Sequence, residues 1–165
     1  MNAGLGGKVT LVCAPAGYGK TSLLVAWIET IDRPTVWLSL DEHDDELASF
    51  VHSLTAALQN VFPDAFGAIA SQLQAPRLPA LDSLVALFSN DLADLPEDLL
   101  LVLDDYHRIR TSEVHSLLER LVEHLPAQVH LVLSSRTDPQ LPLAWWQAQG
   151  HLHELRGSDL RFTLE

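Results

Sequence analysis

Short apolar runs recur along this chain, and amphipathic stretches separate them. Each run is bounded by polar or turn residues and is rich in Val, Ile, Leu or aromatic side chains. Such runs are typical of strands buried on both faces of a parallel sheet. We predict strands at Val9–Cys13, Thr35–Leu40, Leu99–Leu103, Val129–Ser134 and, with less apolar character, Leu152–Arg156.

The stretches between these runs place apolar side chains at helical spacing. We predict helices over Glu46–Val61, Leu81–Leu92 and Glu113–His124, and the start of a further helix at Ser22–Ile28. Thr111 or Ser112 is a candidate cap for the third of these helices. Residues 62–79 contain three prolines, so we expect an irregular connection between two helices there.

Alternation of strands and helices predicts an α/β domain. We expect a three-layer sandwich, with a five-stranded, mainly parallel sheet and helices on both faces. In such sheets ligands bind beyond the carboxyl ends of the strands. The polar motifs of this chain follow predicted strands, so we expect them to meet at one edge of the sheet.

The first motif follows the first predicted strand. Residues 14–21 run Ala-Pro-Ala-Gly-Tyr-Gly-Lys-Thr, and a helix comes next. Strand, glycine-rich loop, Lys-Thr and helix, in that order, predict a P-loop, in which backbone N–H groups and a helix N-terminus neutralise a triphosphate. We assign nucleotide binding to the loop residues Ala16, Gly17, Tyr18, Gly19, Lys20, Thr21 and Ser22.

Two side chains of this loop have specific expected roles. Lys20 extends its ammonium toward the β- and γ-phosphates, and the Thr21 hydroxyl is a ligand of Mg²⁺. The general pattern begins with glycine, whereas this chain has Ala14 at that position. Because the amides that follow are unaffected, we expect binding to survive this departure.

A second motif ends the third predicted strand. The run Leu99–Leu103 is followed by Asp104 and Asp105, which is the form of a Walker B motif. We assign Asp104 to the magnesium site, together with Thr21. Asp105 is positioned to polarise an attacking water. Many ATPases carry the longer Glu there, so Asp105 predicts slow hydrolysis.

A third motif follows the fourth predicted strand, where Arg136 stands beyond two serines. A guanidinium at that strand end can reach a γ-phosphate and stabilise the charge of the transition state, so we include Arg136 among the catalytic candidates. The alternative is a surface arginine paired with a carboxylate such as Asp138.

Composition and charge limit the classes of partner and the compartment that we expect for this chain. The chain has 165 residues, enough for one compact domain, and a net charge of -12 that argues against direct nucleic-acid binding. Cys13 is the only cysteine, so a disulfide framework is excluded and a reducing cytoplasm fits. No signal peptide and no membrane-length apolar run is visible.

Other conspicuous side chains have ordinary explanations. The acidic cluster 41–45 is interpreted as a solvated loop and helix start. Trp27 and Trp37 are expected in the core. Trp145 and Trp146 are adjacent, so one of them is expected at the surface, where it is a candidate contact for another domain.

The series of motifs resembles the nucleotide-binding domain of large LuxR-type bacterial transcriptional regulators, which are similar to the maltose regulon activator and belong to the STAND class of signalling ATPases. The segments that carry the resemblance are Ala14–Thr21, Val36–Asp41, Leu101–His107, Leu131–Pro139, Glu154–Arg156 and Asp159–Phe162. Ala14 at the usual glycine position also resembles this family.

The resemblance implies a switch rather than a metabolic enzyme. Such regulators hold ADP in a closed state, whereas ATP and an inducer drive an open, self-associating state. By resemblance, Arg136 is the sensor arginine. The helical, winged-helix, sensor-repeat and helix-turn-helix domains of such regulators are not in this sequence. We therefore expect residues 1–165 to be a single P-loop domain, a fragment of a longer regulator.

The expected function is binding of ATP or ADP with Mg²⁺ and slow ATP hydrolysis as the nucleotide switch of such a regulator. One alternative is a free-standing P-loop kinase or NTPase, although 10 Lys plus Arg residues leave no Arg-rich lid. The other alternative is a truncated interaction module with little nucleotide affinity.

Overall fold

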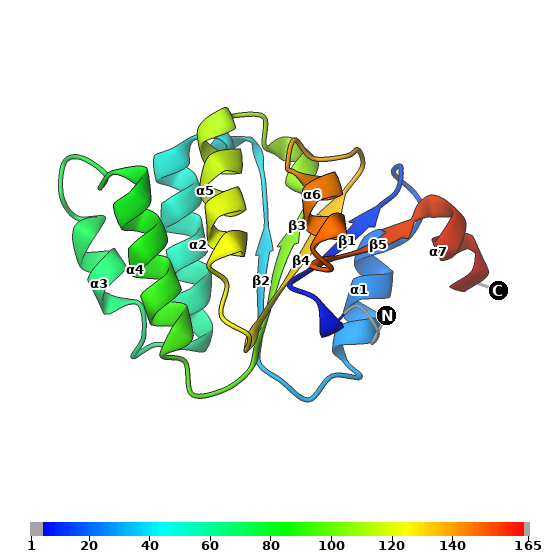
Figure 1. Cartoon of the computed structure of the whole chain (residues 1–165), viewed down its shortest axis with the longest axis horizontal. Coiled ribbons are helices and arrows are strands. Elements are labelled where there is room, and N and C mark those ends of the chain that lie inside the picture. The colour runs from blue at the N-terminus through cyan, green and yellow to red at the C-terminus, as the bar shows by residue number, and fades with distance from the viewer. Residues whose placement is uncertain (1–4, 164–165) are drawn as a thin grey trace.

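A parallel sheet of five strands forms the centre of the molecule (Figure 1). The computed structural model describes residues 5–163, so residues 1–4 and 164–165 of the expected domain lie outside the described part. The strands are β1 (Val9–Cys13), β2 (Thr35–Ser39), β3 (Leu99–Asp104), β4 (Val129–Ser135) and β5 (Leu152–Arg156). All described pairings are parallel, in the order β2-β3-β4-β1-β5. The predicted sheet is confirmed.

Helices cover both faces of the sheet, which confirms the three-layer prediction (Figure 1). One face carries α2 (Leu47–Val61), α3 (Gly67–Gln72), α4 (Leu81–Ala93), α5 (Ser112–Glu123) and α6 (Leu143–Ala148). The other face carries α1 (Lys20–Ile28) and α7 (Gly157–Thr163). The α2–α6 face therefore has the larger core, and the α1 face the smaller one.

The alternation of side chains along β3 decides which residues reach the smaller face. Leu99, Leu101 and Leu103 belong to the larger core, whereas Leu100 and Val102 pack in the smaller core with α1. Since side chains alternate with a period of two, Asp104 is the next position on the α1 side. Strand β3, which is buried on both faces, therefore places the Asp104 carboxylate beside helix α1, which begins with Lys20.

Short helices depart from the prediction. The connection expected over residues 62–79 contains the helix α3, and α6 and α7 were not predicted. Six or seven residues give too few turns for a hydrophobic period to stand out, which explains these omissions. Short 3₁₀ turns also follow two strands, η2 (Glu42–Asp45) after β2 and η3 (Tyr106–Arg108) after β3.

The four tryptophans divide between core and surface. Trp27 is buried as predicted. Trp37, on the edge strand β2, is half-buried and packs against the smaller core, so its core prediction is only partly right. Trp146 is 1% exposed and Trp145 is 59% exposed, which confirms that one of the pair lies at the surface. No helix in residues 5–163 combines the length and apolarity that crossing a bilayer requires.

Candidate functional site

The candidate site lies at the carboxyl ends of β1, β3 and β4. Because these strands are parallel and β4 separates β1 from β3, the segments that follow them meet at one edge of the sheet. The P-loop follows β1, the two aspartates end β3, and Arg136 follows β4. The sheet therefore brings together the three motifs that the sequence predicted.

Two glycines give the P-loop its shape. Gly17 has φ of 87° and Gly19 has φ of 74°, in the left-handed region that glycine adopts without steric cost. Ala14, at the usual position of a further glycine, is buried in the smaller core with Val12 and Leu24. Its methyl group therefore adds apolar packing, which accounts for alanine at this position. Ala16, like Gly17, is exposed.

The Lys20 ammonium lies over the P-loop. Nζ donates hydrogen bonds to the carbonyl oxygens of Ala14, at 2.6 Å, and of Pro15, at 3.3 Å. The side chain is buried, and burial lowers the pKa of Lys20, with a further contribution from the Arg136 guanidinium. The fold thus places the Lys20 side chain at the loop, largely shielded from solvent.

Thr21 and Asp104 meet across the P-loop and β3. The Thr21 hydroxyl donates to the Asp104 carboxylate at 3.2 Å, and the other carboxylate oxygen accepts the Asp105 N–H at 3.1 Å. A hydroxyl beside a carboxylate is an oxygen donor set that suits Mg²⁺, which takes its other ligands from phosphate and water. No group of three or more His, Cys, Asp or Glu residues in 5–163 is arranged to hold a metal alone.

Asp105 has a backbone conformation that is uncommon for a residue with a side chain. Its φ of 60° and ψ of 41° lie in the left-handed region, where aspartate is tolerated better than most residues. The half-buried carboxylate carries a charge that favours the protonated forms of Lys20 and His107. Asp105 therefore stands electrostatically close to both the P-loop and η3.

Arg136 is exposed at the end of β4, and its backbone N–H donates to Nδ1 of His107 at 3.3 Å. The alternative pairing with Asp138 is wrong, because the Asp138 carboxylate accepts a hydrogen bond from Arg156 instead. That hydrogen bond lowers the pKa of Asp138. The charge of Arg136 instead acts on the P-loop, because it helps to lower the pKa of Lys20.

The acidic segment after β2 forms hydrogen bonds with α2 and with the segment before α5. Its interpretation as a solvated loop is therefore only partly right. Asp44 is buried and accepts a hydrogen bond from Ser53 at 2.6 Å. Asp45 accepts the backbone N–H groups of Arg110 and Thr111 at 2.6 and 2.8 Å. Thr111 precedes α5 but forms no side-chain cap, since its hydroxyl donates to the Asp45 carbonyl.

One further contact borders the site. Gly157, the first residue of α7, lies against the Tyr18 ring, and a Cβ at that position would stand 3.3 Å from the ring. Ser22 is exposed on the first turn of α1. No sequence signal indicated the Gly157 contact, because it joins segments nearly the whole chain apart.

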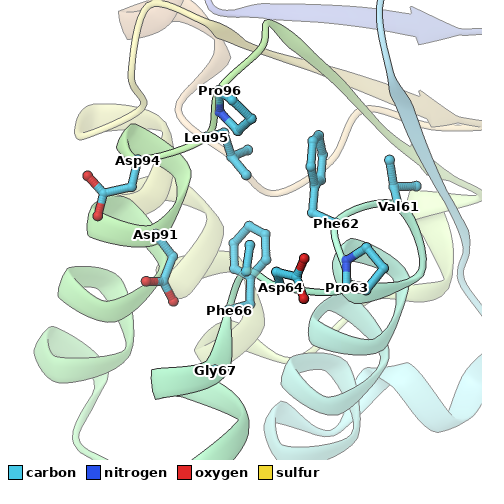
Figure 2. A pocket seen from close by; sticks show the side chains of 11 residues that line it. Val61, Phe62, Pro63, Asp64, Phe66, Gly67, Asp91, Asp94, Leu95 and Pro96 are labelled. Atoms are coloured by element: carbon cyan, nitrogen blue, oxygen red, sulfur yellow. The ribbon is translucent and has the colours of Figure 1, made fainter.

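A separate hollow of about 490 Å³ lies where β3 begins, at the opposite ends of the strands from the P-loop. Figure 2 shows Phe62, Phe66 and Asp64 on the side of α2 and α3, and Asp91 and Asp94 at the end of α4. Burial, with repulsion from Asp94, raises the pKa of Asp91. None of the predicted site residues lines this hollow.

Comparison with known proteins decides the family. The profile of the AAA ATPase domain family matches residues 2–134. The chain belongs to the AAA ATPase domain family. Membership supports nucleotide binding at the edge of the sheet just described.

Curated relatives of this AAA ATPase domain include regulators called HTH-type transcriptional regulator MalT. Identity is 35% over 156 residues with the protein of Klebsiella pneumoniae, and 34% over 156 residues with that of Cronobacter sakazakii. These alignments cover 94% of this chain and 17% of each relative. The predicted resemblance to MalT-like regulators is confirmed, and the chain spans about one-sixth of their length.

Solved structures confirm the fold. Cdc6p from Pyrobaculum aerophilum aligns with a TM-score of 0.54 at 16% identity, over 88% of this chain and 38% of that one. A chain of the Drosophila ORC complex bound to AT-rich DNA and Cdc6 aligns with a TM-score of 0.56 at 17% identity, over 93% and 49%. At these identities the likeness concerns the fold alone.

Proposed function

We propose that this AAA ATPase domain binds ATP or ADP with Mg²⁺, hydrolyses ATP slowly, and acts as the nucleotide switch of a LuxR-type transcriptional regulator. The observation that carries the proposal is the convergence of Lys20, Thr21 and Asp104 at one edge of the sheet. A P-loop cation and a hydroxyl–carboxylate pair together match a magnesium–triphosphate ligand in both charge and donor type.

Binding begins with the P-loop backbone, residues 16–22, at the start of α1. Its N–H groups and the helix N-terminus attract phosphate oxygens. Lys20 turns from the Ala14 and Pro15 carbonyls toward the β- and γ-phosphates. Thr21 and Asp104 would hold Mg²⁺, which would neutralise phosphate charge. The loop and the carboxylate thus form the part of the site that sets affinity.

Hydrolysis depends on the remaining two candidates. Asp105 orients the attacking water and accepts its proton, at a rate limited by the reach of the short side chain. Arg136 neutralises charge on the γ-phosphate, which gives it the means to distinguish ATP from ADP. Its position after β4 and its electrostatic influence on Lys20 support this role.

The likeness to HTH-type transcriptional regulators supports the proposed switch role. Since the chain spans 17% of the MalT proteins it matches, we propose that residues 1–165 are one nucleotide-binding domain of a longer, cytoplasmic regulator. Helical, winged-helix, sensor-repeat and helix-turn-helix domains would complete it, and ATP would promote self-association. The net charge of -12 supports assigning DNA binding to another domain.

The test measures single-turnover hydrolysis beside nucleotide affinity. We expect ADP and phosphate to form from Mg-ATP far more slowly than the typical enzyme turnover of about 10 s⁻¹. Asp105→Asn should slow this step further while nucleotide affinity is retained. Hydrolysis that is unaffected by Asp105→Asn would contradict the assigned role. Transfer of phosphate to a small acceptor, faster than release of free phosphate, would favour the kinase alternative.

A further inference from the structure

A second cavity, of about 490 Å³, lies on the same edge of the sheet as the P-loop. Its walls come from η2 after β2, from η3 after β3, from the segment before α5 and from the end of β4. The volume falls within the range of about 300–1,000 Å³ that is usual for small-ligand sites. The lining residues are Glu42, Asp45, His107, Arg108, Arg110 and Arg136.

The charges in this cavity do not cancel. Glu42 lies 3.7 Å from the Arg108 guanidinium. Partial burial raises the pKa of Asp45, but its hydrogen bonds from the backbone N–H groups of Arg110 and Thr111, together with the charge of Arg110, lower the pKa overall. Glu42 and Asp45 thus offset two of the three guanidinium charges of the cavity. Within the described residues, neither Arg110 nor Arg136 has a side-chain ion pair or hydrogen bond. A positive cavity is unexpected in a chain of net charge -12.

His107 also lines this cavity. Its Nδ1 accepts the backbone N–H of Arg136, so the neutral ring carries its proton on Nε2. Nε2 is buried and has no hydrogen-bond partner among the described residues. Because this nitrogen exposes almost no surface, the groups that can meet a ligand in the cavity are the exposed guanidinium groups of Arg110 and Arg136.

We propose that this cavity binds inorganic phosphate through Arg110 and Arg136. Guanidinium groups match the oxygens of a phosphate in charge and geometry, and two of them facing one ion favour a tetrahedral dianion over a single carboxylate. The net charge of -12 opposes the approach of a long polyanion such as nucleic acid, which favours a small oxyanion as the ligand.

The position of the cavity also suggests the origin of the ion. This part of the proposal rests on the proposed ATPase function. When water attacks the γ-phosphorus, the bond to the β–γ bridging oxygen breaks, and ADP, hydrogen phosphate and one proton result. Arg136 lines the cavity and acts electrostatically on Lys20, so it borders both the P-loop and the cavity. Phosphate formed at the loop can pass to Arg110 before it leaves.

The binding test uses inorganic phosphate as the probe, titrated into the protein saturated with Mg-ADP and followed by calorimetry. Arg110→Gln keeps the backbone N–H that Asp45 accepts, and it removes only the guanidinium. Arg77→Gln is the matched control, since Arg77 is exposed between α3 and α4 and carries the same charge. We expect Arg110→Gln to weaken phosphate binding by about tenfold, and Arg77→Gln to leave it unchanged.

Phosphate affinity that is equal in wild-type and Arg110→Gln protein, or no saturation at millimolar phosphate, would overturn the proposal. Lys20→Ala separates the two claims. Phosphate binding that survives Lys20→Ala but is weakened by Arg110→Gln belongs to the cavity, even if nucleotide binding itself fails. Phosphate binding lost in Lys20→Ala but kept in Arg110→Gln belongs to the P-loop and overturns the proposal.

A kinetic measurement distinguishes product phosphate from phosphate taken up from solution. After mixing with Mg-ATP, release of phosphate should lag behind bond cleavage in the wild type, and the lag should shorten in Arg110→Gln. An equal lag in both proteins would overturn the product role.

Discussion

The two halves of the carboxyl edge differ in how far the fold prepares them for a ligand. At β1 and β3, Lys20 and Asp104 are buried, and Thr21 reaches the Asp104 carboxylate through a hydrogen bond. At β4 and before α5, Arg136 and Arg110 are exposed, and neither side chain is hydrogen-bonded within the described residues. The first half is held in place, whereas the second half is free to respond to what binds.

This difference assigns separate tasks to the two halves. Preorganised groups in a poorly solvated site give strong electrostatic interactions, because little reorganisation is needed when the ligand arrives. Exposed guanidinium groups are screened, and they gain order only when a phosphate is present. We therefore expect the buried half to set nucleotide affinity, and the exposed half to distinguish ATP from ADP and to hold phosphate.

The largest effect should come from Lys20→Ala. The substitution removes the cation that faces the phosphates, and we expect affinity for Mg-ATP to fall by at least about 100-fold, as loss of a charge-assisted hydrogen-bond donor implies. Calorimetric titration measures the change, and the unfolding temperature shows that the fold persists. Arg77→Ala, a charge change outside the site, is the control. Wild-type affinity in Lys20→Ala would refute the role of this ammonium.

Asp104→Ala should have the next largest effect. Without this carboxylate Thr21 alone cannot hold Mg²⁺, so nucleotide affinity should become nearly equal with magnesium and with EDTA. Wild-type protein should bind at least about tenfold more tightly with magnesium. Asp64→Ala removes an exposed carboxylate beside the hollow of Figure 2 and serves as the control. Unchanged magnesium dependence would place the metal elsewhere.

A smaller and more selective effect should come from Arg136→Gln. Loss of an exposed guanidinium should reduce the preference for ATP over ADP by about fivefold, because one charge-assisted contact to the γ-phosphate disappears. Affinity for ADP should remain close to that of the wild type, and Arg77→Gln should leave both values unchanged. If ATP and ADP affinities fell equally, Arg136 would belong to the binding half of the site.

The smallest expected effect is a change of stability with pH, and it involves a histidine near the amino-terminal ends of β1 and β4. His130 is buried, with its ring nitrogens near Thr10 Oγ1 and the Gly7 carbonyl, both at 2.8 Å. Burial lowers the pKa of His130, and likewise those of His107 and His115.

The unfolded chain therefore binds more protons as the pH falls below about 6.5, and the free energy of unfolding should decrease. Urea unfolding at pH 7.5 and 5.5 measures this decrease. His130→Gln should make the pH dependence shallower, although it also lowers stability at pH 7.5 by about 1–3 kcal/mol through its lost hydrogen bonds. An equally steep pH dependence would assign the effect to the other two histidines.

The buried half of the site was predictable from the sequence, because its geometry follows from local patterns. An apolar run that ends in Asp104 predicts a central strand with a carboxylate at its tip. A loop ending in Lys20 and Thr21 predicts a helix N-terminus beside it. Parallel pairing of β3 and β4, and of β4 and β1, then brings these ends together without any further information.

The exposed half was not predictable, because it depends on contacts between distant segments. Asp45 accepts N–H groups of Arg110 and Thr111, more than sixty residues away. Asp138 pairs with Arg156 and not with Arg136, which is nearer in the sequence. In a single sequence such pairings have no periodic pattern and no motif, and acidic residues after a strand look like ordinary solvated side chains.

The most direct test of the central claim is calorimetric titration of the 165-residue chain with Mg-ATP at neutral pH. The prepared P-loop, with Lys20 over it and Thr21 bonded to Asp104, predicts saturable one-to-one binding with a Kd below about 1 mM, a binding free energy stronger than about 4 kcal/mol. No binding at millimolar Mg-ATP, in a sample that circular dichroism shows to be folded, would contradict the account.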